Sequence, residues 1–427
     1  MIRIAWFSPL PPVRSGVAAY SAELLALLGR VFEIERFEER HAHDFVWKHQ
    51  RAPYDIVVYQ LGNAPCHDYM WGYLTAYPGL VVLHDMRLHH ARARRLLNQE
   101  RFDDYRREFR YDHPDAPPGV VEYAVEGMGG SIYYLWSMLR VVVRTARAVA
   151  VHNGRIAEEL REQYPGLPVD VVRMGVAPFA AGHHARERTR RELSLPEDAM
   201  VFAVFGKVTA EKRIAAILRA AGRLTAQGTN ALLLLIGDAT EYPALNDEVR
   251  KSGLEDRVRV TGYVADDRVG DYLATADACL CLRWPSAGET SASWLRSLAA
   301  ARPTIITDLA HLVDIPTLDA RTWDRSRPSA EPIAVAVDLL DEDDGLTAAM
   351  RRLATDADQR AKLARASYTH WSSEHTLEAM ASDYRRLIEQ TTARPAPRVD
   401  DLPSHFTNDY TGLVSQILRE FGLDPFM

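Results

Sequence analysis

Short apolar runs recur along the chain, with helix-compatible stretches between them. In the first half these runs occupy residues 2–7, 55–61, 79–85 and 146–153. In the second half they occupy residues 201–206, 231–238, 257–263, 276–283 and 303–308. Strands that alternate with helices are typical of βαβ units and of a parallel sheet. The pattern therefore predicts an α/β fold made of two doubly wound domains.

The periodic pattern stops in "MGVAPFAAGHHARERTRREL", where a basic helix is expected to begin. We therefore expect an N-terminal domain over residues 1–185 and a C-terminal domain over residues 186–390. Within the second domain, the acids of "DLLDEDDG" are expected to form a solvated loop. Residues 391–427 are expected to form an extended linker, "ARPAPRVDDLP", followed by a short amphipathic segment, "TGLVSQILREFG".

Length and charge narrow the class of protein. A chain of 427 residues suits two domains of ordinary size. The formal net charge of -7 gives no reason to expect nucleic-acid binding, and no apolar run is long enough to span a bilayer. A peripheral membrane contact through local basic clusters stays open. The start "MIRIAWFSP" lacks the layout of a signal peptide, so we expect a cytoplasmic protein.

The stretch "FGKVTAEKR" places a glycine and two lysines where an apolar run ends. Gly206 closes the expected strand, and Lys207 and Lys212 lie in or beside the turn that leads into a helix. In an open α/β sheet such turns line the ligand-binding crevice at the carboxyl ends of the strands. The alternative is a solvated surface turn, because lysine is mostly exposed in proteins.

Two strand ends of the first domain offer polar side chains. "HDMRLHH" places His84 and Asp85 at the end of one strand, and "LGNAPCHDY" places Asn63 and His67 after another. His89 and His90 follow His84 and Asp85, but the spacing of these four residues does not match a standard zinc site. Their location instead favours a hydrogen-bonding site for a sugar or an acceptor. No metal is therefore expected.

Two further loops contain glycines beside an expected helix start. Gly16, in "SPLPPVRSGVAAY", either lets a ligand approach the backbone closely or allows close helix packing. The loop has no G-x-G-x-x-G motif, which argues against a dinucleotide-binding dehydrogenase. In "RWPSAGETSASWLRSLAAARP", Gly288 and Glu289 precede Thr290 and Ser291. Free amides at a helix start bind phosphate, and a carboxylate can accept hydrogen bonds from sugar hydroxyls. The alternative is that Glu289 and Thr290 only cap the helix.

These motifs resemble the retaining, nucleotide-sugar-dependent glycosyltransferases of family 4, which have the GT-B architecture of two facing Rossmann-like domains. The resemblance covers roughly residues 1–390. It is strongest in the second half, where five motifs occur in the family's order: "FGKVTAEKR", "LLLLIGD", "VTGYV", "YLATADACLCLR" and "GETSASWLRSLAAARPTIITD".

The resemblance implies roles for the candidate residues. Lys207 and Lys212 would hold the donor diphosphate and offset the charge that develops on the leaving group, so no metal and no cofactor would be needed. His84 would meet the transferring sugar, and Gly16 would approach the phosphates or the acceptor. Glu289 would contact the donor sugar. The other residues on the donor side would be Gly206, Gly288, Thr290, Ser291 and Arg296.

One feature of the family is missing. The family carries a second glutamate eight positions after the first, which contacts the ribose of the nucleotide. Here that position is Ser297, or Arg296 if the "LAAARP" segment sets the alignment. Arg296 could instead meet a phosphate or an acidic group of the donor.

Three functions fit these observations. The first is a glycosyltransferase that moves a sugar from a UDP- or GDP-type donor, with retention, onto an acceptor held mainly by the N-terminal domain. The second is an epimerase or hydrolase of nucleotide sugars on the same fold, since fold does not fix function. The third is a non-catalytic sugar-nucleotide-binding or scaffold protein, for which the missing glutamate is the sequence hint.

Overall fold

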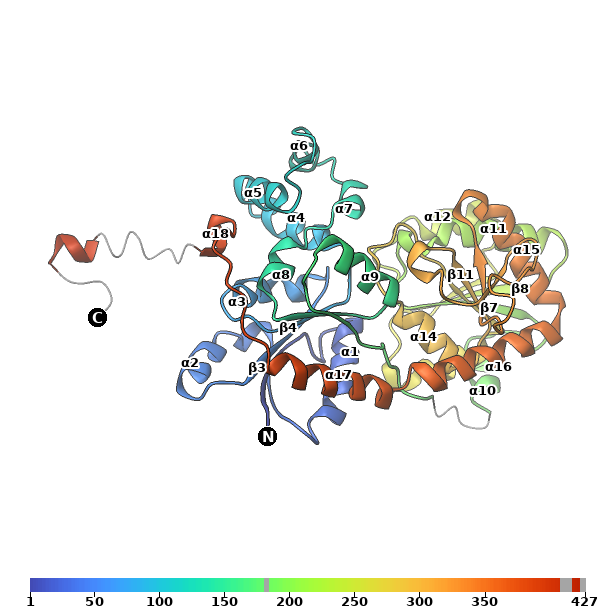
Figure 1. Cartoon of the computed structure of the whole chain (residues 1–427). Coiled ribbons are helices and arrows are strands. Elements are labelled where there is room, and N and C mark those ends of the chain that lie inside the picture. The colour runs from blue at the N-terminus through green and yellow to red at the C-terminus, as the bar shows by residue number, and fades with distance from the viewer. Residues whose placement is uncertain (180–183, 408–416, 423–427) are drawn as a thin grey trace. The chain divides into compact units, whose positions relative to one another are not determined.

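The computed structural model describes residues 1–179, 184–407 and 417–422, and the chain divides into two compact units (Figure 1). Unit 1 consists of Met1–Val13, Gly29–Val171 and Arg385–Met427, and unit 2 consists of Arg14–Leu28 and Val172–Tyr384. This division differs from the predicted boundaries at residues 185 and 390. Residues 411–416 of the predicted amphipathic segment lie outside the described residues.

The segment after residue 171 belongs to unit 2 because it is tied to the helix α17, Leu377–Thr392, and to the residues just before it. The Val176 N–H donates to the His375 carbonyl at 3.0 Å. The Arg173 guanidinium forms an ion pair with Asp383 at 2.7 Å. These contacts explain why unit 2 begins before the basic helix that the sequence pattern marks.

Unit 1 contains a sheet of six parallel strands in the order β2-β1-β3-β4-β5-β6. The strands are β1 Arg3–Phe7, β2 Glu33–Phe37, β3 Ile56–Leu61, β4 Leu80–Leu83, β5 Ala148–Val151 and β6 Val169–Val171. The first strand has β2 on one side and β3 on the other, so the direction of winding changes at β1. Ligands bind at such switch points in open α/β sheets.

The helices of unit 1 cover this sheet and add a further helical layer. They are α2 Asp44–Arg51, α3 Trp71–Leu74, α4 His89–Leu97, α5 Phe102–Asp112, α6 Val120–Val125, α7 Ile132–Leu135, α8 Arg140–Thr145, α9 Gly154–Gln163 and α18 Ser404–Thr407. Helices α5, α6 and α7 lie beyond α4, on the side away from the sheet (Figure 1). A small core of its own, which includes Leu96, Tyr105 and Phe109, holds this layer together.

Unit 2 contains a sheet of seven parallel strands in the order β12-β13-β11-β10-β7-β8-β9. The strands are β7 Met200–Phe205, β8 Ala231–Ile236, β9 Val258–Val260, β10 Ala278–Cys281, β11 Thr304–Thr307, β12 Thr317–Asp319 and β13 Ala334–Val337. Here the winding changes direction at β7, which lies between β8 and β10. The carboxyl end of β7 is therefore the switch point of this unit.

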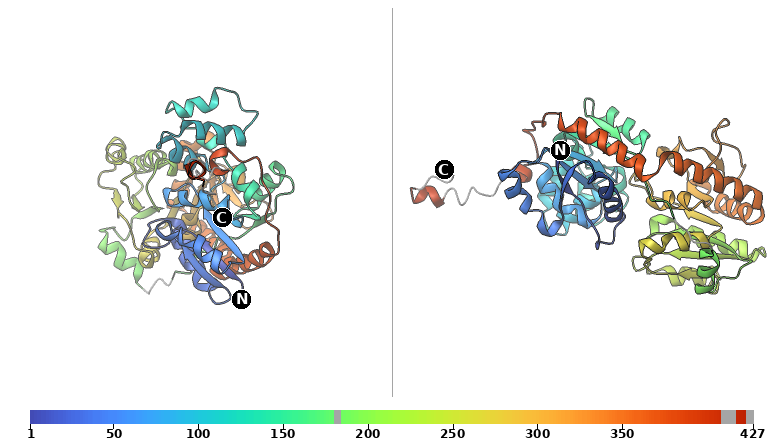
Figure 2. Two further views of the ribbon diagram at one scale, coloured as in Figure 1. Left: turned by 90° about the vertical axis from the view of Figure 1, so that its left-hand side faces the viewer. Right: turned by 90° about the horizontal axis from the view of Figure 1, so that it is seen from below.

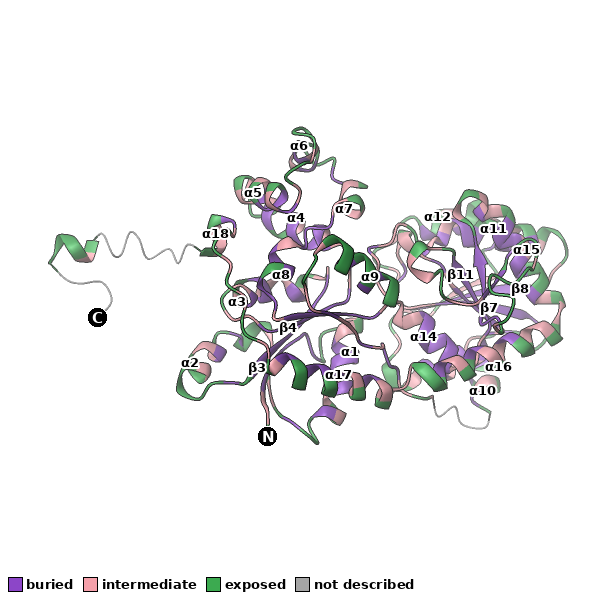
Figure 3. Cartoon of the chain, in the orientation of Figure 1, coloured by how far each residue is buried: buried purple, intermediate pink, exposed green. Residues whose placement is uncertain are grey.

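Helices lie on both faces of the unit 2 sheet (Figure 2). The helices that belong to unit 2 are α1 Gly16–Leu28, α10 Ala185–Glu192, α11 Ile214–Ala226, α12 Leu245–Lys251, α13 Val269–Thr275, α14 Ala292–Ala299, α15 Glu342–Thr355, α16 Ala357–Glu374 and the first part of α17. Along β7, Phe202 packs in one core and Val201 in the other, because successive side chains point to opposite faces. Both are buried, and the strands of this sheet are coloured largely as buried in Figure 3.

The acidic run after β13 is ordered, and the predicted solvated loop is wrong. Glu342 and Asp343 lie in the first turn of α15, where acidic side chains favour the positive end of the helix dipole. Glu342 is buried and accepts a hydrogen bond from Arg213 Nε at 2.7 Å, and Asp343 pairs with Arg219 at 2.7 Å. The run therefore joins α15 to the start of α11.

None of the helices in the described part of the chain combines the length and the apolar character that crossing a membrane requires.

Candidate functional site

The turn after β7 brings a glycine and a buried lysine together. Gly206 has a φ of +90°, a conformation that favours glycine, and its N–H donates to the Ile236 carbonyl at 2.9 Å. A Cβ at this position would lie 2.8 Å from Lys212 Nζ and 3.0 Å from Ser293 Oγ. The ammonium group of Lys212 therefore lies directly beside the backbone of Gly206, at the switch point of unit 2.

Lys212 is a cation in a poorly solvated position. It lies in the 3-10 turn η3, Ala210–Lys212, is 8% exposed, and donates from Nζ to the Phe205 carbonyl at 2.5 Å. Burial lowers the pKa of its ammonium to about 7, and the nearby Arg283 cation acts in the same direction. No ion pair to a carboxylate is found for Lys212 in the described ranges. An anion that binds here would supply the missing opposite charge.

Lys207, the second lysine of the motif, is in a different environment. Its side chain is half exposed and forms an ion pair with Glu241, on the loop after β8. An exposed pair of this kind contributes little to stability, so Glu241 can release the lysine to a ligand at small cost. The role of Lys207 in holding a diphosphate stays a prediction.

Glu289 lies in a loop that fixes its carboxylate on several sides. It accepts hydrogen bonds from Ser286 Oγ and from the Ala287 N–H, each at 2.9 Å, and forms an ion pair with Arg283 Nε at 2.8 Å. Gly288 has a φ of +77°, which allows the sharp turn before the glutamate. Because Arg283 contacts Glu289 and also acts on Lys212, it connects the two motifs electrostatically.

The helix that follows this loop is capped by Ser291. Its side chain accepts a hydrogen bond from the Trp294 N–H at 3.2 Å at the start of α14. The alternative in which Glu289 and Thr290 only cap the helix is therefore wrong for Glu289, whose carboxylate bonds within the preceding loop. Thr290 lies between the two, outside the helix.

Neither candidate for the missing second acid replaces it. Ser297 is fully buried and donates from Oγ to the Ser293 carbonyl at 3.0 Å. Arg296 is almost fully buried and pairs with Glu23 of α1 at 3.4 Å and with Asp266 at 3.2 Å. Two carboxylates thus already pair with this guanidinium. The contact of Arg296 with a phosphate stays a prediction.

Gly16 begins α1, and the structure bears on why it is a glycine. A Cβ at this position would meet no atom within 4 Å. Close helix packing therefore does not require glycine here. The other interpretation, a close approach of a ligand, keeps its basis and stays a prediction.

In unit 1, a glutamine holds two of the predicted histidines. Gln60 Oε1 lies 2.8 Å from His84 Nε2, and the Gln60 carbonyl lies 2.8 Å from His67 Nδ1. Burial lowers the pKa of His67 to about 4. Burial, His152 and His67 hold the pKa of His84 well below its ordinary value. Both imidazoles are neutral at physiological pH and suited to hydrogen bonding.

Asn63 and Asp85 lie together just after the carboxyl ends of β3 and β4. The Asn63 N–H donates to Asp85 Oδ2 at 2.7 Å. The Asn63 amide group donates to the Arg87 carbonyl at 2.6 Å and accepts from the Ala91 N–H at 3.2 Å. Asn63 thus positions the start of α4, and its predicted contact with an acceptor stays a prediction. No group of three or more His, Cys, Asp or Glu in the described residues could hold a metal.

Three residues of these sites were missed by sequence reasoning. A Cβ on Gly237 would lie 2.3 Å from the Gly206 carbonyl oxygen, so the ends of β7 and β8 approach each other as only glycine allows. The signal was present, because the apolar residues of the neighbouring runs "VFAVFG" and "LLLLIGD" are both followed directly by glycine. Gln60, a polar residue inside an apolar run, was a similar signal. Nothing in the sequence pattern indicated Arg283.

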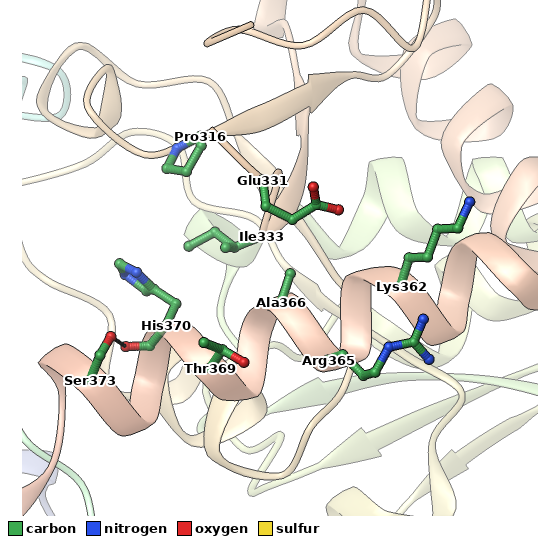
Figure 4. Close-up of a pocket in the computed structure, with 9 residues that line it drawn as sticks. All are labelled: Pro316, Glu331, Ile333, Lys362, Arg365, Ala366, Thr369, His370 and Ser373. Atoms are coloured by element: carbon green, nitrogen blue, oxygen red, sulfur yellow. Dashed lines mark hydrogen bonds between the residues drawn. The ribbon is translucent and has the colours of Figure 1, made fainter. Parts of the chain in front are cut away.

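A separate groove of about 470 Å³ lies at the amino ends of strands β12 and β13 in the unit 2 sheet. It runs along α16, with Lys362 and Arg365 at one end and His370 and Ser373 at the other (Figure 4). Its opposite wall includes Ile333, which immediately precedes β13. In a parallel sheet, the amino ends of the strands lie opposite the carboxyl ends, so this groove is not part of the site after β7.

A family model matches the part of unit 2 that contains the site after β7. Residues 199–356 match the family described as "Glycosyl transferases group 1". These residues contain the turn after β7 and the loop of Glu289. The chain is also 27% identical over 221 residues to the lipopolysaccharide core biosynthesis glycosyltransferase LpsD of Rhizobium meliloti (strain 1021), which covers 51% of this chain and 58% of that protein. The chain spans 37% to 58% of the length of the curated relatives that it matches.

Two solved structures resemble nearly the whole chain. Sucrose-phosphate synthase from Thermosynechococcus elongatus has a TM-score of 0.64 at 16% identity, and the match covers 92% of this chain and 100% of that chain. HepE from Anabaena, in complex with UDP-glucose, has a TM-score of 0.62 at 12% identity, over 91% of this chain and 100% of that chain. At these identities the likeness establishes the fold. The chain thus has the GT-B fold of two doubly wound, Rossmann-like α/β units, and residues 199–356 are a glycosyl transferases group 1 domain.

Proposed function

We propose that this protein is a glycosyltransferase that moves a sugar from a UDP- or GDP-type nucleotide sugar to an acceptor bound by unit 1. The observation that carries the proposal is the buried cation Lys212 beside Gly206, at the switch point of a domain that matches the glycosyltransferase family. A structural neighbour binds UDP-glucose, which favours a UDP-sugar as the donor.

In the proposed mechanism, the chain supplies electrostatic stabilisation. When the bond between the sugar and the diphosphate breaks, negative charge grows on the leaving phosphate. Lys212 and Lys207 stabilise this charge more in the transition state than in the ground state, which accelerates the reaction. The acceptor attacks the same face of the sugar, the leaving phosphate takes its proton, and the configuration is retained. Neither a metal ion nor a protein nucleophile is needed.

Thermal unfolding of the full chain with UDP, GDP, ADP and dTDP and their common sugar conjugates tests this proposal. A ligand that binds only the folded state raises the melting temperature. We expect a rise with UDP or GDP and their sugars, equal with and without magnesium. A rise only in magnesium would contradict metal independence, and no rise with any nucleotide would overturn the proposal. Once an acceptor is found, the anomeric proton signals of the product would report retention or inversion.

A non-catalytic nucleotide-sugar-binding protein is the second candidate. It is favoured by the loss of the second acid, because Ser297 is fully buried and Arg296 is already paired. This candidate predicts that nucleotide sugars raise the melting temperature but are never turned over. Turnover of a donor with any acceptor would exclude it.

Donor binding should be linked to proton uptake at Lys212. The pKa of this group is about 7 in the free protein, and a bound diphosphate would raise it. The affinity for UDP-glucose is therefore full below pH 7 and falls as the pH rises above 7 toward the pKa of the bound state. The diphosphate diester of UDP-glucose does not titrate in this range.

Calorimetric titration with UDP-glucose at pH 8, in two buffers of different ionisation enthalpy, measures this uptake. We expect a buffer-dependent heat in the wild type and none in Lys212→Met. A wild-type heat that is the same in both buffers would contradict the linkage.

A further inference from the structure

Unit 1 contains a groove of about 560 Å³ that none of the sites above uses. One wall is the end of α7 and the residue after it, Leu135 and Trp136, together with His113, which follows α5. The other wall is α9, with Glu159 and Gln163, and Arg87 also lines the groove. All of these residues belong to unit 1.

The first wall presents apolar and aromatic surface in a fixed orientation. Leu135 is 73% exposed, although leucine is normally buried. The indole ring of Trp136 packs edge-on against His113, with ring centroids 4.8 Å apart, and against Phe109 at 5.5 Å. The Trp136 carbonyl lies 3.0 Å from His89 Nδ1. These contacts hold the Trp136 indole and its backbone in place, while Leu135 faces the solvent.

The second wall presents planar polar groups at the edge of the groove. Arg87, whose side chain is 26% exposed, and Glu159, whose side chain is 50% exposed, form an ion pair at 3.2 Å, and Glu162 and Gln163 follow on the next turn of α9. Guanidinium, carboxylate and amide groups can each bond two neighbouring hydroxyls at once. Because the Glu159 side chain is 50% exposed, the ion pair contributes little to stability, and Glu159 can turn toward a ligand at small cost.

The sum of charges in the groove selects among ligands. Arg87 contributes one positive charge, and Glu159 and Glu162 contribute two negative charges. A phosphate or another anion is therefore disfavoured. The combination of an aromatic wall with planar hydrogen-bonding groups suits a sugar ring, which has apolar C–H faces and a polar rim.

The groove also lies close to the carboxyl ends of strands β3 and β4 in its own sheet. Arg87 comes three residues after His84 and four residues after the end of β4. Its carbonyl accepts the hydrogen bond from the Asn63 amide, so it is joined to the cluster at the carboxyl ends of β3 and β4. A molecule in the groove is therefore next to the edge at which open α/β sheets bind their ligands.

We propose that this groove binds a neutral saccharide, as the part of the acceptor that Trp136 and Glu159 recognise. The proposal rests on the proposed function, because it names the class of the acceptor. Trp136 contacts one face of a sugar ring, and Arg87 and Glu159 bond its hydroxyls.

Saturation-transfer NMR on the full chain tests the groove, with maltose, cellobiose, lactose and chitobiose as probes. At least one of these disaccharides should receive magnetisation from the protein. We expect Trp136→Ala to weaken its binding about tenfold, and Glu159→Gln to weaken it by a similar factor. Glu159 is exposed, so its replacement leaves the fold intact even if Trp136→Ala does not fold. The matched control is Trp47→Ala, because Trp47 is 66% exposed on α2 of the same unit.

Three outcomes would overturn the proposal: no signal with any of the four disaccharides, equal binding in Glu159→Gln and the wild type, or stronger binding of glucose 6-phosphate than of glucose. The test is independent of the donor site. If UDP still raises the melting temperature while no disaccharide binds, only the groove proposal fails. If a disaccharide binds and Glu159→Gln weakens it, but no nucleotide binds, only the proposed donor function fails.

Discussion

Replacing Lys212 with methionine should lower the rate of sugar transfer by about ten- to a thousandfold, the usual range for losing one group that stabilises a developing charge. The ammonium lies beside Gly206 at the end of β7, where a diphosphate can approach the backbone closely. Methionine has a similar length and no charge, so the variant removes the cation and keeps most of the packing. The loss should appear in kcat, because the charge on the leaving group grows in the transition state.

The same substitution should leave the fold at least as stable as before. Burial already lowers the pKa of Lys212, which means that the folded chain pays to keep this group charged. An apolar residue of equal size removes that cost. A loss of activity with an unchanged or higher melting temperature would thus separate a role in catalysis from a role in folding.

Lys362→Met is the matched control, because Lys362 is an exposed lysine of the same unit and lines the groove at the amino ends of the strands. Its rate should equal that of the wild type. The rate of Lys207→Met should lie between that of Lys212→Met and that of Lys362→Met, since Lys207 is half exposed and paired with Glu241. Wild-type rates in both Lys212→Met and Lys207→Met would remove the basis for placing a diphosphate at this turn.

Much of the fold follows from the sequence because its central strands are buried on both faces. All six residues of β3 and of β8 are buried, and such strands appear as continuous apolar runs. The missed strands lie toward the edges. Strand β2, "EIERF", alternates with charge because it is an edge strand with little burial, and β13, "AVAV", is too short for its period to distinguish a strand from a helix.

The candidate site could be predicted only as far as its position on the strand ends. That rule locates Gly206 and Lys212 correctly at the switch point. The burial of Lys212, its link to Arg283 and the support of two histidines by Gln60 depend on tertiary contacts that no local pattern encodes. The same holds for Arg296, whose pairing with Glu23 joins residues far apart in the sequence.

The second large effect concerns an ion pair that anchors the outer helical layer of unit 1. Arg92 of α4 and Glu108 of α5 are 4% and 2% exposed, and Arg92 Nε donates to Glu108 Oε2 at 2.7 Å. His405 of α18 also lies within 2.7 Å of this carboxylate. Burial alone would raise the pKa of Glu108, but Arg92 and His405 outweigh it and hold the pKa below its usual value.

We expect Arg92→Met to destabilise unit 1 by about 3–5 kcal/mol, because it leaves a buried carboxylate without its main partner. Hydrogen exchange of the amides in α4 and α5, in the full chain, measures this loss locally. The matched control is Arg95→Met, since Arg95 is exposed on the same helix and should change protection by only a few tenths of a kcal/mol.

Two further measurements separate the lost pair from lost packing. The double variant Arg92→Met, Glu108→Gln should recover much of the stability, because a buried pair contributes little beyond its own desolvation cost. The low pKa of Glu108 in the wild type contributes stability above its unfolded pKa that is lost as the pH falls. Once Arg92 is gone, the carboxyl can protonate more easily, so the deficit of Arg92→Met should shrink toward acid pH. A deficit that stays the same at pH 4.5 and pH 7.5 and is not relieved by Glu108→Gln would mean that the stacking of the Arg92 guanidinium over the Trp71 ring, 4.3 Å from its centroid, stabilises this layer instead of the ion pair with Glu108.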